Sequence, residues 1–134
     1  MGENSGDYTI RNAIDILSDG SIVCQGEVPV GSEIHLMISS RASAKQAALE
    51  ATRMALNRLK GQTPKLVFIL ESITRLKLLG RSAFGEIKQI KEILPPQTPI
   101  FGMYGHGEIT SYSETGQTLN TNLQNESIVV LAIS

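Results

Sequence analysis

The chain has a single cysteine, Cys24, no tryptophan, and few aromatic residues of any kind, at 4% of the sequence. With one cysteine no disulfide can form within the chain, which suits a reducing compartment, so we expect a cytoplasmic protein. The longest apolar run, residues 128–133, is far below the roughly 20 residues needed to cross a bilayer. We therefore expect no insertion into a membrane.

The sequence also lacks an excess of either sign of charge, because 12 basic and 13 acidic residues give a formal net charge of -1. Without a basic run, binding to nucleic acid through phosphate neutralisation is not expected. His35, His106 and Cys24 lack the spacing of metal ligands, and the glycines match no phosphate-binding or dinucleotide motif. No elbow motif surrounds a serine. We expect no metal, no cofactor and no enzymatic activity.

What the sequence does contain is the composition of one soluble globular domain, with 41% hydrophobic and 19% charged residues in 134. Residues 1–7 resemble a flexible leader, or the boundary of a domain cut from a longer protein. We expect residues 8–134 to form a single domain.

Short apolar segments and two helical patterns alternate along the chain. The pattern predicts helices over 43–60, with Ser43 and Gln46 as a capping box, and over 82–94, ended by the prolines at 95 and 96. Strands are expected at 8–17, 21–24, 33–38, 66–70, 100–104, 109–112 and 127–133. This order predicts a mixed α/β (α+β) fold. It has one mixed sheet of about seven to eight strands, two main helices, βαβαβ crossovers and flanking antiparallel hairpins.

Polar residues follow directly after two of the expected central strands, 66–70 and 100–104. The strand–helix–strand order makes these strands parallel, so their carboxyl ends meet at one edge of the sheet. Ligands of open α/β sheets usually bind beyond that edge. We therefore expect residues 71–75 and 105–108 to lie close together and to form a site.

The side chains of these two segments suit a small zwitterion such as an amino acid. Arg75 offers a planar fork of donors to a carboxylate, and Glu71 or Glu108 can receive an ammonium group. The corner that contains His106 and Gly107 exposes amides that can bind an anion. An equally weighted alternative is a structural ion pair between Arg75 and Glu108 that joins the two loops.

The same corner resembles the C-terminal half of FIST domains, the F-box and intracellular signal transduction proteins. The resemblance covers nearly the whole chain. Its segments are Gly102-Met-Tyr104, Gly107-Glu-Ile109, Asn125-Glu-Ser127, Val28-Pro-Val-Gly31, Ile34-His-Leu-Met37, and Arg75 with Leu78-Leu-Gly80 and a Glu-bearing helix.

The resemblance implies a sensory input domain of signalling proteins that responds to a small ligand, amino acids among the proposed ones. It adds Tyr104 and Asn125 to the candidate ligand-binding residues, and it implies a signalling protein or an N-terminal FIST half as a partner. Members commonly carry a cysteine where this chain has Ser72, so no thiol role is implied here. The alternative function is a protein-interaction module of a signalling or ubiquitin-ligase-type protein that binds no small molecule.

Overall fold

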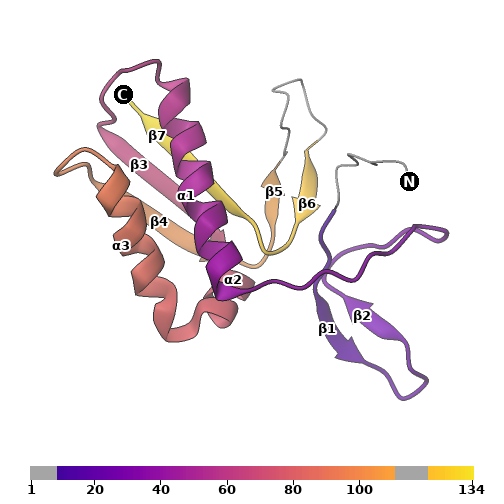
Figure 1. Cartoon of the computed structure of the whole chain (residues 1–134). Helices are drawn as coiled ribbons and strands as arrows, with labels where there is room; N and C mark the ends of the chain where they lie inside the picture. The colour runs from indigo at the N-terminus through magenta and orange to yellow at the C-terminus, as the bar shows by residue number, and fades with distance from the viewer. Residues whose placement is uncertain (1–8, 111–120) are drawn as a thin grey trace, which may run out of the picture.

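The computed structural model describes residues 9–110 and 121–134, so the expected leader and the end of the expected strand 109–112 lie outside the described residues. At the centre is a three-stranded sheet in the order β4-β3-β7 (Figure 1). The continuous apolar run forms β3, Leu66–Ser72. It pairs in parallel with β4, Ile100–Gly105, and antiparallel with β7, Ile128–Ile133.

Two helices cover one face of this sheet, α1 (Arg41–Arg58) and α3 (Ala83–Ile93) (Figure 1). The face of α1 that meets the sheet carries small side chains, so the helix can lie close to the strands. The buried core between the layers consists of Ala48, Val67, Ile69, Ile90 and Leu94. The opposite face of the sheet has no covering layer among the described residues, and Phe101 and Leu131 are 60% and 53% exposed there.

The start of α1 differs from the prediction by two residues. Ser40 is the N-cap, because its hydroxyl accepts from the Ser43 amide while the Ser43 hydroxyl accepts from the Ser40 amide. The expected box of Ser43 and Gln46 was wrong, since a second serine three residues earlier offers the same reciprocal pair.

A short helix that the sequence pattern did not indicate follows β3 directly. This helix, α2 (Ile73–Leu79), leads through a 3-10 turn, η1 (Gly80–Ser82), into α3. The segment expected to be a loop at the sheet edge is therefore helical, which changes where its side chains point.

Two antiparallel hairpins flank the body, as expected. They pair β1 (Ala13–Ile16) with β2 (Ile22–Cys24), and β5 (Glu108–Thr110) with β6 (Asn122–Gln124). Figure 1 shows the β1–β2 hairpin projecting from the end of the α/β body.

The mixed α/β (α+β) class is confirmed, and among the described residues seven strands and two main helices are present. The single large sheet was wrong, because the strands divide into sheets of two, three and two. The expected strand 33–38 is absent, so only the crossover from β3 to β4 is formed. Within the described ranges no helix is long and apolar enough to cross a membrane.

Candidate functional site

Glu71 occupies the last position of β3 that faces the helices. Residues alternate in and out along the strand, and Val67 and Ile69 fill the two earlier inward positions with apolar side chains. Glu71 is 2% exposed although it carries a carboxylate. A charged group in such a place requires a partner.

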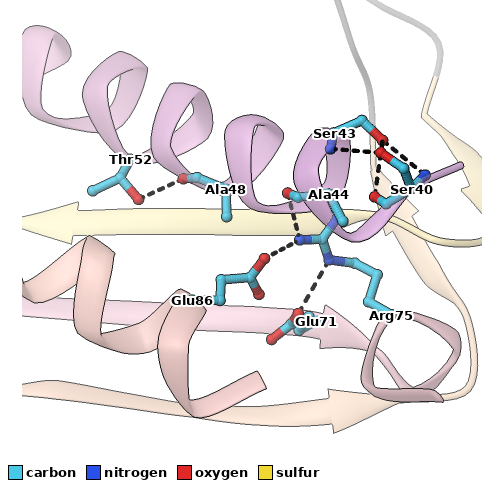
Figure 2. A network of polar contacts seen from close by, with 8 residues as sticks. All are labelled: Ser40, Ser43, Ala44, Ala48, Thr52, Glu71, Arg75 and Glu86. Carbon is cyan, nitrogen blue, oxygen red and sulfur yellow. Dashed lines mark hydrogen bonds and ion pairs between the residues drawn. The ribbon is translucent and has the colours of Figure 1, made fainter. Parts of the chain in front are cut away.

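That partner is Arg75, in the first turn of α2. Its Nε donates to Glu71 Oε1 at 3.1 Å, and its second terminal nitrogen donates to Glu86 Oε2 at 2.6 Å and to the Ala44 carbonyl at 3.0 Å. Figure 2 shows the guanidinium between the two carboxylates, beneath α1. One side chain therefore ties β3, α1 and α3 together.

The cluster holds two carboxylates against one guanidinium. Burial, and after it the hydrogen bond with Glu71, raise the pKa of Glu86 to about 8 against the opposing charge of Arg75. At neutral pH Glu86 is therefore mostly protonated.

Tyr104 is the neighbour of Glu71 on β4 and lies in direct register with it. Burial raises the pKa of Tyr104, and the negative charges of Glu71 and Glu86 raise it further. Parallel strands in register place side chains on the same face, so Tyr104 and Glu71 both point to the helix side of the sheet.

Beside these two residues is a pocket of about 450 Å³ between the open edge of β4 and the η1–α3 segment. Apart from Glu71 and Tyr104 its lining is apolar or glycine. The other residues are Ile69, Leu76, Gly80, Ala83, Phe84, Ile87, Ile100, Phe101, Gly102 and Met103. A pocket of this size, apolar with a few polar groups at one end, is typical of small-molecule sites.

The glycine corner contains a second buried polar group. Glu108 is 8% exposed, and its Oε2 accepts from the Ser127 hydroxyl at 2.7 Å. Asn125 is 1% exposed, and its Oδ1 accepts from the Asn12 amide at 3.1 Å. Asn125 thus fastens the segment before β1 to the end of β6.

His106 and Gly107 are both exposed at this corner. The His106 carbonyl accepts from the side chain of Gln25, so the β2 end of the first hairpin contacts the corner. Within the described residues no group of histidine, cysteine, aspartate or glutamate side chains could hold a metal ion.

The structure brings together only part of the predicted site. The carboxyl ends of β3 and β4 do lie at one edge, and Glu71 and Tyr104 are adjacent there. Arg75 does not lie open at that edge, because it is 4% exposed and donates hydrogen bonds to Glu71 and Glu86. The alternative ion pair with Glu108 is not formed, since α2 turns Arg75 back onto Glu71.

Glu86 is the residue that sequence reasoning missed. It lies three residues after Ala83 and four before Ile90, both of which are buried on the inner face of α3. A carboxylate at that spacing on an apolar helix face was a visible signal of a buried charge.

One comparison with known proteins gave a match. The family model described as the FIST C domain matches residues 1–111. Searches of curated proteins and of solved structures found no match. Because the family match covers most of the chain, the protein belongs to the FIST C domain family and is a signal-transduction domain.

Proposed function

We propose that this domain is a cytoplasmic, non-enzymatic sensor whose ligand is a small molecule with an ammonium group and an apolar part, an apolar amino acid being the example. The ligand lies in the β4 pocket, with its ammonium group toward Glu71 and Tyr104. The observation that carries the proposal is the side chain of Glu71, held by Arg75 at one end of a pocket whose lining, apart from Tyr104, is otherwise apolar or glycine.

The buried cluster supports this role by its chemistry. Arg75 fixes the position of Glu71 by donating from its Nε to Glu71 Oε1 at 3.1 Å. A preorganised carboxylate in a largely apolar surrounding binds an ammonium group more strongly than one in water. Arg75 then acts as a positioning residue and does not itself contact the ligand.

Only one of the two charged groups of the expected zwitterion has a partner available in this pocket. The ammonium half of the expected ligand has an acceptor in Glu71, whereas the expected partner of the carboxylate half, Arg75, is occupied by internal contacts. The ligand's carboxylate, where one is present, lies toward the open side of the pocket. Affinity should therefore depend on the amine and on the apolar part.

Three probes of similar size separate these contributions: leucine, 3-methylbutylamine and 4-methylpentanoate. We expect leucine and the amine to raise the melting temperature of the domain by mass action, and the carboxylate probe, which lacks the ammonium group, to leave it unchanged. Titration calorimetry then gives the affinities. Stabilisation by 4-methylpentanoate alone, or by none of the three and no other amine, contradicts the proposal.

A variant on the wall of the pocket locates the binding. Phe84 lines the pocket and is 88% exposed, so Phe84→Ser should weaken binding without disturbing the core. The matched control is Ile109→Ser, which removes a 77% exposed apolar side chain away from the pocket. Equal loss of binding in both variants would place the ligand elsewhere.

The second candidate function is a protein-interaction module, in which a signalling protein or an N-terminal FIST half is the partner. It is favoured by the uncovered face of the sheet, where Phe101, Met103, Leu131 and Ile133 are between 44% and 60% exposed. Contiguous exposed apolar side chains of this kind mark interaction sites. Binding of a partner that Phe84→Ser leaves intact would favour this candidate.

A further inference from the structure

The pocket beside Glu71 runs along the outer edge of β4, because consecutive residues of that strand line it. Ile100, Gly102 and Tyr104 are in register with the inward positions of β3. Phe101 and Met103 lie between them, belong to the uncovered face of the sheet, and line the pocket too. Since successive side chains of a strand point to opposite faces, a pocket bordered by all five residues borders the backbone at the edge of the strand.

This edge of β4 has no partner strand in the part of the chain that the structure describes. β4 pairs with β3 on one side, and no described strand pairs with its other side (Figure 1). Ile100–Gly105 includes neither a charged residue nor a proline, two of the features by which proteins protect an edge strand from pairing. The edge therefore presents backbone amides and carbonyls with which an extended chain can pair.

The polar side chains of the pocket lie at one end, beside the carboxyl end of β4. They are Glu71, whose Oε1 accepts from Arg75 Nε at 3.1 Å, and Tyr104, in register with Glu71. Beyond them the lining is apolar or glycine, with Phe84 and Ile87 contributed by α3. A ligand that fills the pocket meets hydrogen-bonding side chains at one of its ends and apolar side chains along its length.

We infer that the pocket binds an extended peptide with a free amino terminus, which adds to the open edge of β4 as a further strand. The inference rests on the proposed function, because the small amine of that proposal becomes the first residue of the peptide. Its ammonium group lies at Glu71 and Tyr104, and its backbone pairs with β4. In strand addition of this kind, main-chain hydrogen bonds give affinity and alternate side chains give selectivity.

The acidic end of the pocket sets the direction of the peptide. A peptide carboxylate at this end would place a third carboxyl group, after those of Glu71 and Glu86, beside the single guanidinium of Arg75. An amino terminus instead adds hydrogen-bond donors and a positive charge, which suit acidic neighbours. Because this end of the pocket is the carboxyl end of β4, the peptide runs antiparallel to β4.

The register decides which peptide side chains enter the pocket. With the first peptide residue opposite Tyr104, the third is opposite Gly102, and directly opposite residues share a face of the sheet. The first and third side chains therefore point to the helix side, where the lining is apolar. Gly102 has no side chain, which leaves room for the third one. The site should select apolar residues at positions one and three of the peptide.

The test uses peptide probes and titration calorimetry on the full chain. The main probe is the tetrapeptide amide Leu-Ser-Leu-Ser, and leucinamide shares its amino terminus and first side chain. We expect the tetrapeptide to bind at least about tenfold more tightly than leucinamide, because it adds main-chain hydrogen bonds. N-acetylation of the tetrapeptide removes the ammonium group and should weaken binding at least about tenfold. The matched control, Ser-Leu-Ser-Leu amide, has the same composition in the wrong register and should also bind more weakly.

Methylation of single peptide nitrogens distinguishes strand addition from other modes of binding. Only every second residue of an antiparallel strand directs its amide to a given neighbour, so the nitrogens of peptide residues 2 and 3 should respond differently. We expect methylation at one of them to weaken binding at least about tenfold, and at the other less than about threefold.

Hydrogen exchange locates the added strand. Bound tetrapeptide should slow the exchange of amides within Ile100–Gly105. The internal control is the outer edge of β7, which also has no partner strand among the described residues but does not line the pocket. Amide exchange in β7 should be unchanged.

The outcomes separate this inference from the proposed function. Leucinamide that binds as tightly as the tetrapeptide would overturn the inference and leave the amine site standing. Equal effects of methylation at both nitrogens, an acetylated peptide that binds as tightly as the free one, or exchange slowed equally in β4 and β7 would also overturn it. Failure of every probe, with leucine and 3-methylbutylamine included, would overturn the proposed function as well.

Discussion

Arg75 and Glu86 form the shortest contact of the buried charge cluster, with 2.6 Å between the guanidinium nitrogen and Oε2 and with side chains 5% and 1% exposed. The contact joins α2 to α3 and, through Glu71, both to β3. The geometry of the pocket beside Glu71 therefore depends on a group whose charge changes near neutral pH.

The first prediction concerns the pH dependence of stability. Because the pKa of Glu86 is raised from 4.5 to about 8 on folding, the folded chain binds a proton that the unfolded chain has released between these values. The free energy of unfolding should fall as pH rises through this window, by at most about 1.4 kcal/mol per pH unit from this group. Glu86→Gln should remove this contribution, measured by urea unfolding at several pH values.

The control for this experiment is Glu92→Gln, on an exposed position of the same helix. It should keep the pH dependence of the unaltered chain. A slope that is the same in all three proteins would show that Glu86 is ionised in the folded state throughout.

The second prediction concerns Arg75. Arg75→Met should lower the free energy of unfolding by about 3–5 kcal/mol, because it leaves a buried carboxylate without its partner. Adding Glu71→Gln should recover part of that loss, since the unpaired charge is then also removed. Urea unfolding of the single and double variants measures the coupling, and additive losses would argue against a buried ion pair.

Much of the fold followed from local patterns. The run at Leu66–Leu70 is apolar on both faces and long enough only for a strand, and the alanines of α1 repeat at helical spacing, so both elements were correctly predicted. Segment 33–38 was also expected to be a strand but is none in the structure. A local pattern does not by itself determine whether a segment pairs with a neighbouring strand.

The sequence predicted where the candidate site lies, at one edge of the sheet, but not which side chains meet there. The carboxyl ends of β3 and β4 meet at one edge, as predicted, and the structure places Glu71 in register with Tyr104 there. The direction of Arg75 depended on α2, a helix of seven residues with no apolar periodicity long enough to detect. Because of this helix, Arg75 contacts the buried Glu71 and Glu86 instead of the expected Glu108.

The third prediction concerns the close approach of β3 and β4. A Cβ on Gly102 would overlap the Ile69 carbonyl oxygen, and paired backbones cannot move apart without losing their hydrogen bonds. Gly102→Ala should therefore destabilise the domain by about 1–3 kcal/mol or more.

Gly85 gives the matched control for this substitution. It lies within α3, and the nearest atom to an added Cβ is the mobile end of Lys45 at 3.2 Å. Gly85→Ala should be neutral or stabilising by up to about 1 kcal/mol, because alanine has the better helix propensity. Thermal unfolding of both variants makes the comparison, and equal effects would count against a steric cause at Gly102.

The last prediction concerns how the first hairpin is fastened to the body. The Asn12 amide donates to Asn125 Oδ1, whereas two residues earlier the Ile10 amide donates to Gln124 Oε1 at 3.0 Å. Asn125→Ala should therefore speed hydrogen exchange at the Asn12 amide, and Gln124→Ala should speed it at Ile10, each leaving the other amide less affected. Because Asn125 is buried and Gln124 is only partly so, Asn125→Ala should also cost more stability, about 1–3 kcal/mol. If both amides exchange equally fast in both variants, the segment is held as one unit by other contacts, among them the Arg11 bond to the Leu123 carbonyl at 2.7 Å.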